Sequence, residues 1–193
     1  MKIQDASTNK MKTLDLGCGK KKQKGAIGID ISRETDADII HDLNIFPYPF
    51  ADNEFDYIYA DNIIEHLGSV VKVMEELHRI TKHGATIKII VPFFRSIYAC
   101  IDPTHEHFFT SRSFDYFDPQ KKFNQLYKYS TCFFKVEKVL FDEGPGHGLV
   151  GKILTWIANK NPIFYETRMS MFFPLNTLTY YLKTMKNNEE GGV

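Results

Sequence analysis

The chain has 193 residues, with 24 basic and 24 acidic side chains, 43% hydrophobic residues and 25% charged residues. This balance is typical of a globular protein with a sizeable core, and it excludes disordered, collagen-like and coiled-coil classes. A net charge of zero gives no overall basic field to hold a polyanion, so we expect no nucleic-acid partner. No apolar run approaches the roughly 20 residues that a membrane-spanning helix needs, so we expect no membrane insertion.

The N-terminal residues and the cysteines indicate the compartment. The first residues contain no apolar stretch that could serve as a signal-peptide core, so we expect a cytoplasmic protein. The three cysteines, Cys18, Cys100 and Cys132, lie far apart and form no C-x-x-C pair. They predict free thiols rather than a disulfide framework or a zinc ribbon.

Short apolar runs recur along the first half of the chain, at residues 13–16, 26–30, 37–41, 55–60 and 85–91. Each is bounded by Gly, Asp, Asn or Pro, as expected for strands buried on both faces of a parallel sheet. Between the last two runs, an i, i+3, i+4, i+7 pattern predicts a helix from Val70 to Ile80, with Ser69 as its N-cap and Gly84 as a stop signal. The alternation predicts an α/β fold, a doubly wound Rossmann-like sheet whose ligand lies beyond the carboxyl ends of its strands.

The second half is rich in aromatic residues. Residues 133–142 and 177–185 predict two further strands, and residues 149–159 predict a helix. No repeat, low-complexity tract or linker separates the two halves, so we expect one domain over residues 1–193.

A glycine turn follows the first predicted strand. Gly17 and Gly19 form a G-x-G pattern, in which the missing side chains allow a tight turn and let a ligand approach the backbone. The second strand ends in Asp30, where a carboxylate can accept hydrogen bonds from both hydroxyls of a ribose. The third strand ends at Asp42 and Leu43, which offer an acceptor for an exocyclic amine and an apolar contact for a flat base. This order of features predicts a nucleoside-containing ligand.

A dinucleotide-binding site is the nearest alternative, and the spacing disfavours it. Lys22 occupies the position of the third glycine, and Asp30 follows sooner than the usual separation of about 20 residues. Residues 20–25 are too few for the full helix whose dipole would hold a pyrophosphate. Four lysines in this segment either form a solvated loop or contact an anionic substrate, and both interpretations stay open.

These motifs resemble those of the class I S-adenosylmethionine-dependent methyltransferases. Three further segments share the resemblance: His41-Asp42-Leu43, residues 55–60 and Glu65-His66-Leu67. Residues 46–56 are similar to those of the small type-eleven group. The resemblance covers roughly residues 13–92. It implies a mostly parallel seven-stranded sheet with the last strand antiparallel, S-adenosyl-L-methionine as the cofactor, a cofactor-binding half at about residues 10–92 and an acceptor-side half at about 93–186.

The resemblance also implies roles for individual residues. The methionine end of the cofactor would be lined by Asp15, Gly17, Cys18 and Gly19; the ribose by Asp30 with Ile31 beside it; the adenine by Asp42 and Leu43; and the floor near the sulfonium by Ala60, Asp61 and Asn62.

Histidines are the candidates for catalysis. Methyl transfer is an in-line displacement in which positioning supplies much of the acceleration, so a dedicated catalytic residue is not obligatory. An oxygen acceptor must lose its proton, and histidine has a suitable ordinary pKa near 6.5. His66 follows the fourth strand, where it either contacts cofactor or acceptor or makes structural hydrogen bonds. We expect the neighbouring Glu65 to face solvent or to form an ion pair.

His105 lies in residues 102–110, a polar segment after the fifth strand whose Asp-Pro-Thr-His also resembles the methyltransferase group. It is a general base or substrate contact, a loop histidine bonded to backbone, or a metal ligand with Asp102 and His107. No second ligand cluster is evident, so we expect no metal.

Aromatic side chains around this segment either pack in the core or stack on an acceptor: Phe93, Phe94, Tyr98, Phe108, Phe109, Phe114, Tyr116 and Phe117. Residues 169–173 are either packed or form a partner or membrane surface. The sequence predicts an enzyme that methylates oxygen or nitrogen of a small, polar or sugar-like molecule. The alternative is a catalytically silent Rossmann-like binding module that acts through a partner surface. A homodimer stays open.

Overall fold

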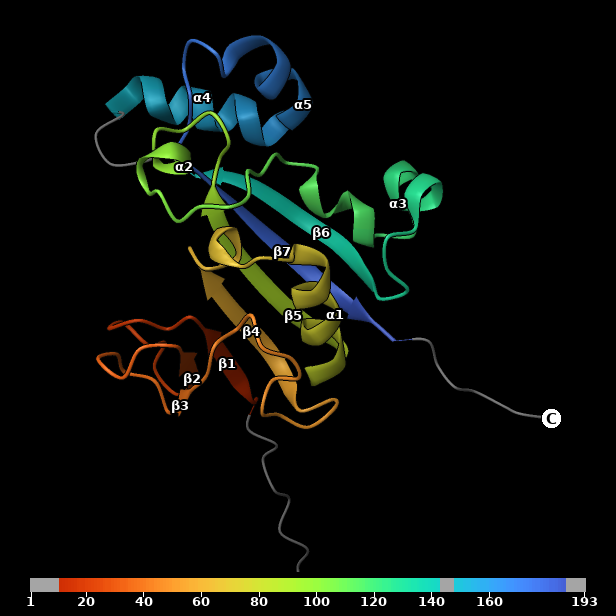
Figure 1. Ribbon diagram of the computed structural model, residues 1–193. Coiled ribbons are helices and arrows are strands. Elements are labelled where there is room, and N and C mark those ends of the chain that lie inside the picture. Colours follow the sequence, from red (N-terminus) through yellow and green to blue (C-terminus); the bar gives the residue numbers. More distant parts are fainter. Residues whose placement is uncertain (1–10, 143–147, 187–193) are drawn as a thin grey trace, which may run out of the picture.

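The computed structural model describes residues 11–142 and 148–186; the first ten residues, on which the signal-peptide argument rests, lie outside this part. One seven-stranded sheet has the order β3-β2-β1-β4-β5-β7-β6 (Figure 1). Neighbouring strands are parallel except at β7, which runs antiparallel to both β5 and β6. The predicted mostly parallel sheet with an antiparallel last strand is confirmed. Its strands are β1 (Thr13–Leu16), β2 (Ile27–Asp30), β3 (Ile39–Ile40), β4 (Phe55–Asp61), β5 (Thr81–Pro92), β6 (Phe133–Asp142) and β7 (Thr177–Met185).

The central strands are buried, as their apolar runs predict. Leu14, Ile29, Ile58 and Ile89 have no solvent-exposed surface. Burial of such side chains contributes roughly 1.5–3 kcal/mol each, and it holds the first half of the chain together.

Helix α1 (Val70–Ile80) has the predicted bounds and packs against β5. The Ser69 hydroxyl accepts the backbone N–H of Lys72 at 3.4 Å, which caps the first turn. The predicted stop at Gly84 is wrong, because the chain enters β5 directly at Thr81. Gly84 lies inside that strand with φ +75°, beside a shift in the register between β4 and β5. This left-handed backbone is available to glycine at little cost and lets the strand resume its pairing.

Loops rather than helices connect β1 to β2, β2 to β3 and β3 to β4. The prediction that residues 20–25 are too short for a helix is therefore confirmed. The loop after β1 is fixed by carboxylates: Asp30 accepts the Gly19 N–H at 2.9 Å, and Asp15 accepts the Gln23 N–H at 2.6 Å. These bonds hold the glycine turn at the carboxyl ends of β1 and β2.

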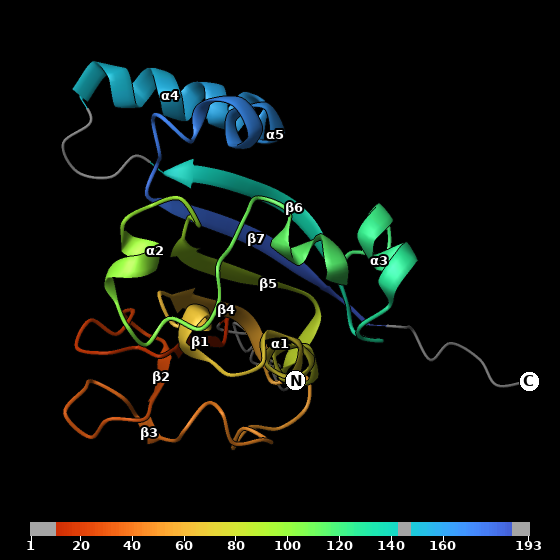
Figure 2. The same ribbon diagram turned by 45° about the horizontal axis from the view of Figure 1, so that its top comes forward.

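The remaining helices follow β4, β5 and β6. They are η1 (Ile64–His66), α2 (Tyr98–Ile101), η2 (Ser113–Phe117), α3 (Lys122–Tyr127), α4 (Gly148–Lys160), α5 (Pro162–Phe164) and the π-helical η3 (Tyr165–Met169). Helix α4 confirms the prediction over residues 149–159. Figure 2 shows α4 and α5 together beyond β6, far from β1 to β3. None of the described helices has the length and apolar character needed to cross a membrane.

The aromatic residues of the second half divide between core and surface. Phe93, Phe109, Phe114 and Phe117 are buried in the core, whereas Phe108 is 58% exposed. Phe94 and Tyr116 pack against this core, so core packing accounts for most of the aromatic set, and Tyr98 and Phe108 are the two exposed rings.

Candidate functional site

A pocket of about 410 Å³ lies at the carboxyl ends of β1 and β4. This is the edge at which open parallel sheets bind their ligands. Several predicted cofactor residues line it, namely Asp15, Gly17, Cys18, Gly19, Asp61 and Asn62, together with Lys20, Lys21, Gln23 and Tyr59. The structure thus brings the glycine turn and the end of β4 to one cavity.

Packing as well as backbone geometry demands a glycine at position 17. Its φ is +67°, and a Cβ atom there would lie 2.5 Å from Cγ1 of Ile63. The turn is also tied to β2, because the N–H groups of Gly17 and Cys18 donate to the Ile29 carbonyl at 2.9 and 3.2 Å. A side chain at Gly17 would therefore displace the turn or the residues that follow β4.

Two carboxylates, those of Asp15 and Asp61, lie in the lining of the pocket beside Lys20 and Lys21. Asp15 is 3% exposed, and burial raises its pKa, with a further contribution from the charge of Asp61. Asp61 is held by the Tyr59 hydroxyl and by the Asn62 side-chain amide, each donating at 2.8 Å. A cationic sulfonium fits such a pocket, because it would relieve the repulsion between the two carboxylates.

The other predicted cofactor residues have varied surroundings. Asp30 is partly buried beside the glycine turn, and its second oxygen accepts the Ser32 N–H at 2.9 Å. Ile31 is 65% exposed, Leu43 packs in the core, and Ala60 is fully buried. Asp42 accepts the Asn44 N–H at 2.9 Å in a local turn. None of these five residues lines the 410 Å³ pocket.

The lysines of residues 20–25 are predicted either to form a solvated loop or to contact an anionic substrate, and their positions differ. Lys22 lies 2.8 Å from both carboxylate oxygens of Asp38, and this bond lowers the pKa of Asp38. Lys20 and Lys21 line the pocket instead. Lys22 therefore fixes the loop, and two other lysines remain beside the ligand site.

The segment after β5 folds back onto the segment after β4. The N–H of Glu106 donates to the Glu65 carbonyl at 2.8 Å, and His107 Nε2 bonds to the Leu67 carbonyl at 2.8 Å. This arrangement brings His105 to His66, with ring centroids 4.6 Å apart. His107 is turned to the Leu67 carbonyl, so the pair of His105 and His107 considered as metal ligands does not form around one centre.

Glu65 completes this cluster, and nothing in the sequence indicated its burial there. The side chain is fully buried, and neither carboxylate oxygen has a hydrogen-bond partner in the described part of the chain. Nε2 of His105 lies 4.0 Å from Oε1 of Glu65, beyond hydrogen-bond distance. Burial raises the pKa of Glu65 to about 7. Of the two expectations for Glu65, exposure to solvent is wrong, because the segment 40 residues away covers the side chain; an ion-pair partner is present in His105 when its ring is protonated.

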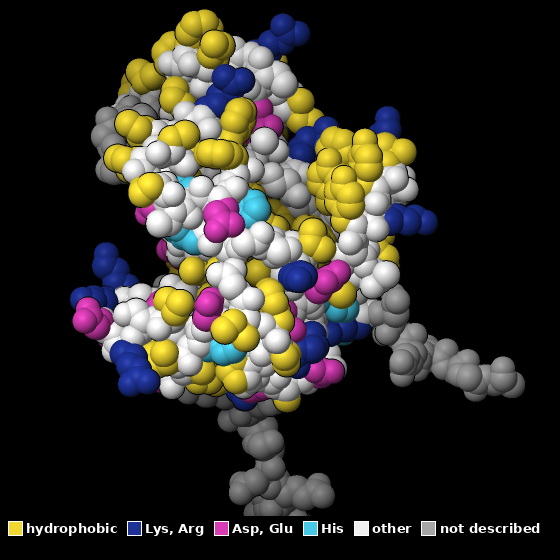
Figure 3. All heavy atoms as spheres, in the orientation of Figure 1, with side chains coloured by type: hydrophobic (Ala, Val, Ile, Leu, Met, Phe, Trp, Pro, Cys, Tyr) yellow, Lys and Arg dark blue, Asp and Glu magenta, His cyan; other side chains and the backbone are white. Residues whose placement is uncertain are grey.

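A second hollow, of about 380 Å³, is lined in part by this folded-back segment. Its lining comes from the start of α1, the segment after β5, η2 and the residues after α3: Val70, Val71, Glu106, His107, Phe108, Phe109, Ser113, Tyr116, Phe117 and Tyr129. Tyr116 and Tyr129 are stacked, with centroids 5.4 Å apart. Figure 3 shows a recess beside the hydrophobic side chains that gather over α3.

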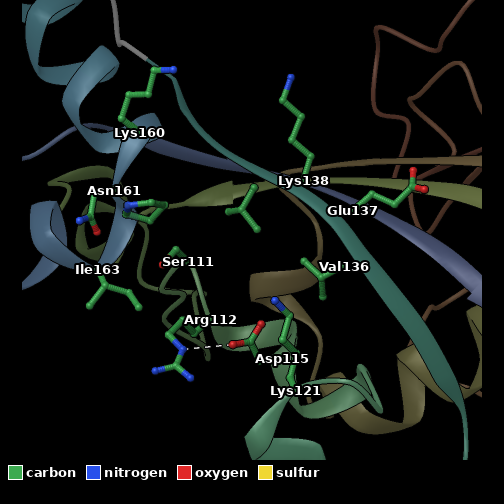
Figure 4. A pocket seen from close by; sticks show the side chains of 12 residues that line it. Ser111, Arg112, Asp115, Lys121, Val136, Glu137, Lys138, Lys160, Asn161 and Ile163 are labelled. Atoms are coloured by element: carbon green, nitrogen blue, oxygen red, sulfur yellow. Dashed lines mark hydrogen bonds and ion pairs between the residues drawn. The ribbon is translucent and has the colours of Figure 1, made fainter.

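Another cavity, of about 470 Å³, lies elsewhere, between β6, η2 and the start of α5 (Figure 4). Arg112 and Asp115 are paired there at 3.1 Å, and Figure 4 shows Lys138 and Lys160 pointing away from that pair. It contains none of the predicted site residues. Position in the sheet therefore favours the 410 Å³ pocket as the cofactor site.

Comparisons with known proteins point to methyltransferases. Residues 14–89 match the family model described as a methyltransferase domain, of the type-eleven group. A methyltransferase structure from Archaeoglobus fulgidus is 18% identical with a TM-score of 0.56, and the alignment covers 90% of this chain and 86% of that one. A methyltransferase from Mesorhizobium loti is 13% identical with a TM-score of 0.52, covering 90% of each chain. No curated protein matches the sequence.

The same fold also occurs in the [4+2]-cyclase SpnF, 13% identical with a TM-score of 0.56 over 92% of this chain and 75% of that one. Structural likeness alone therefore does not fix the reaction. The fold is that of the class I methyltransferases, with a Rossmann-like sheet. Residues 14–89, from β1 into β5, match the methyltransferase model, and with this fold the protein is an S-adenosylmethionine-dependent methyltransferase whose cofactor is S-adenosylmethionine.

Proposed function

We propose that the enzyme methylates oxygen or nitrogen of a small, polar, sugar-like acceptor, and that this acceptor binds in the 380 Å³ hollow. The lining of the hollow is the observation that carries the proposal. It combines the carboxylate of Glu106 and the imidazole of His107 with the rings of Phe108 and Tyr129. Aromatic rings cover the apolar face of a sugar, and the polar groups bond to its hydroxyls. Two of the segments that line the hollow, the start of α1 and residues 106–109, follow the carboxyl ends of β4 and β5.

The cofactor roles implied by the family resemblance form part of this proposal. The methionine end is assigned to Asp15, Gly17, Cys18 and Gly19, the ribose to Asp30 and Ile31, the adenine to Asp42 and Leu43, and the sulfonium region to Ala60, Asp61 and Asn62. The shared pocket supports the first and last of these groups. The hydrogen bond between Asp30 and the Gly19 N–H supports a ribose site adjoining it.

His66 and His105 are assigned to the acceptor side, where they orient the acceptor. The support is their position on the two segments that join the cofactor pocket to the hollow. We expect His105→Ala to keep the affinity for S-adenosylmethionine and to reduce turnover. Equal loss of cofactor affinity and of thermal stability would contradict this assignment and indicate a structural role.

The test of the acceptor class is a screen that measures S-adenosylhomocysteine release with sugars, polyols, amino sugars, carboxylic acids, amines and apolar phenols. Sugar-like hydroxyl or amino compounds should be turned over. Turnover confined to apolar phenols would contradict the proposal.

A pair of variants tests the hollow itself. Phe108→Ala and Tyr129→Ala should each raise the KM for the acceptor about 2- to 10-fold, the equivalent of one lost aromatic contact, without changing the cofactor Kd. Leu126→Ala removes a side chain that is 60% exposed outside the hollow, and it serves as the control. Unchanged KM in both aromatic variants would place the acceptor elsewhere.

We also propose that the enzyme acts in the cytoplasm and without nucleic acid. Three free cysteines, of which Cys100 is exposed, suit a reducing compartment. Cell fractionation and co-purified nucleic acid are the corresponding measurements.

A further inference from the structure

We infer that Glu65, His66 and His105 form a binding site for one divalent transition-metal ion of the Zn²⁺ class. One ligand atom from each residue lies within 4.8 Å of the others. The cluster begins three residues after Asn62, which lines the cofactor pocket. Metal binding is measured without any acceptor, so its outcome is independent of the proposed acceptor class.

The buried carboxylate is the first argument for an ion. Both oxygens of Glu65 lack a hydrogen-bond partner among the described residues, and the side chain is 1% exposed. Leaving an ionised carboxylate buried without a partner is costly, and such groups are normally paired or bound to a metal. The N–H groups of Glu106 and His107 go to the backbone carbonyl of Glu65, so they do not satisfy its side chain.

Thr104 and Asp102 orient the ring of His66 through a chain of hydrogen bonds. The Thr104 hydroxyl donates to Asp102 at 2.7 Å, so its oxygen accepts the proton of His66 Nδ1, 2.8 Å away. This relay fixes the tautomer of the neutral ring in which Nε2 carries a lone pair. A metal-binding histidine is commonly oriented by such a partner on its other nitrogen.

His105 is oriented in the same way. Its Nδ1 lies 3.0 Å from the Ala99 carbonyl, which can only accept a hydrogen bond. Nδ1 therefore carries the proton, and Nε2 presents its lone pair toward Glu65 at 4.0 Å. The lone pair of His105 and the Glu65 carboxylate then face each other without a donor between them, and a ring nitrogen of His66 lies within 4.8 Å of both, which is the donor set of a cation site.

The chemistry of the ligands selects the class of ion. Imidazole suits Zn²⁺, Fe²⁺ and similar ions, whereas Mg²⁺ and Ca²⁺ prefer oxygen ligands alone. Bonds of about 2.0–2.2 Å place tetrahedral ligands roughly 3.3 Å apart, so the three side chains would close by about 1 Å around the ion. Three protein ligands leave at least one coordination position open, as in catalytic zinc sites.

The experiment titrates the chelator-treated full-length protein with Zn²⁺ in competition with a chromophoric chelator. One Zn²⁺ per chain should bind, and Co²⁺ in its place should give visible d–d absorption. Glu65→Gln and His105→Gln should each weaken Zn²⁺ binding by more than about 100-fold, because they remove ligands rather than supporting partners. Thr104→Val, an exposed substitution that releases His66, should weaken it by about 10- to 100-fold.

His83→Gln is the matched control, because it removes an exposed histidine outside the cluster and should leave Zn²⁺ affinity unchanged. Retained S-adenosylmethionine binding and circular dichroism show that each variant is folded. Absence of stoichiometric Zn²⁺ binding by the wild type would overturn the inference in favour of a proton shared by the cluster. Wild-type affinity in both ligand variants would overturn it in favour of a site at other side chains.

Discussion

Backbone N–H groups around the glycine turn bond to three carboxylates, those of Asp15, Asp30 and Asp38. A carboxylate has about four acceptor positions, so each can hold the loop and still accept a bond from a ligand. The same side chains therefore shape the pocket and supply its charge. Substitutions there should change ligand affinity and local order together.

Asp30→Ala should weaken S-adenosylmethionine binding about 10- to 150-fold. The change removes charge-assisted hydrogen bonds of about 1.5–3 kcal/mol in total. Isothermal titration calorimetry measures the Kd, and Glu34→Ala, an exposed carboxylate in the following turn, is the control. Wild-type affinity in Asp30→Ala would remove Asp30 from the cofactor site.

Two glycine substitutions separate backbone strain from steric overlap. Gly19→Ala meets no atom within 4 Å, so it should cost only about 1–2 kcal/mol for its φ of +53°. Gly17→Ala adds the overlap with Ile63, which should cost roughly 1–3 kcal/mol more. Chemical denaturation measures both free energies of unfolding.

The additional cost of Gly17→Ala should decrease when the substitution is made in an Ile63→Ala background, which removes Cγ1 and Cδ1 at 2.5 and 2.7 Å and leaves Cβ at 2.9 Å. Persistence of the full cost in that background would show that the overlap is not its cause.

At the level of elements, α1 and the C-terminal end of β7 are joined by polar contacts across the sheet. His78 Nε2 on α1 lies 3.0 Å from the Met185 carbonyl, and its ring meets Phe134 edge-on at 5.5 Å. Thr81 and Thr184 join their hydroxyls at 2.8 Å beside it. Loss of the β6-β7 pair would therefore also remove these contacts of α1.

His78 should make the fold less stable in mild acid. Burial lowers its pKa below the ordinary value of 6.5, so the unfolded chain binds this proton more readily than the folded one. Stability from this group is therefore present above about pH 6.5 and is lost as pH falls toward the folded pKa. Glu65, whose pKa is raised to about 7, has the opposite trend over this range, so the contribution of His78 is the difference in free energy of unfolding between wild type and His78→Gln, which should decrease from pH 8 to pH 5.

His78→Gln keeps an N–H donor for the Met185 carbonyl and does not titrate. Its free energy of unfolding should match the wild type at pH 8 and decline less on acidification. An identical decline in both proteins would exclude His78 as a source of the pH dependence.

At the level of the whole molecule, patterns within the chain predicted most of the sheet. In the β-branched runs and in the amphipathic repeat from Val70 to Ile80, buried residues recur at fixed intervals along the sequence, so the positions of these elements could be inferred. The two-residue β3 and the start of β5 at Thr81 depend on pairing with neighbours. The contact of Glu65 with His105 joins segments with no shared pattern, and only the folded chain brings them together.

Thiol reactivity should report on opening of the whole fold. Burial, with the charges of Asp15 and Asp30, raises the pKa of Cys18 to about 11, and its side chain is 7% exposed. Cys100 is exposed. A thiol reagent at pH 8 should modify Cys100 rapidly and Cys18 only as the structure opens.

Cys100→Ser/Cys132→Ser isolates the reaction of Cys18. Bound S-adenosylmethionine should slow it further, because Cys18 lines the cofactor pocket. Modification of Cys18 at the rate of Cys100 would contradict the burial of the glycine turn.

The central place of β7 has a consequence for biosynthesis. β7 is the last of the described strands to leave the ribosome, yet it lies between β5 and β6, which are made earlier. Until it emerges, the nascent chain has two separate strand edges and an incomplete apolar surface, the features that chaperones recognise and that promote aggregation. A translation pause placed before residue 177 should therefore increase chaperone association of the nascent chain, whereas a pause in an added C-terminal extension long enough for β7 to emerge should not.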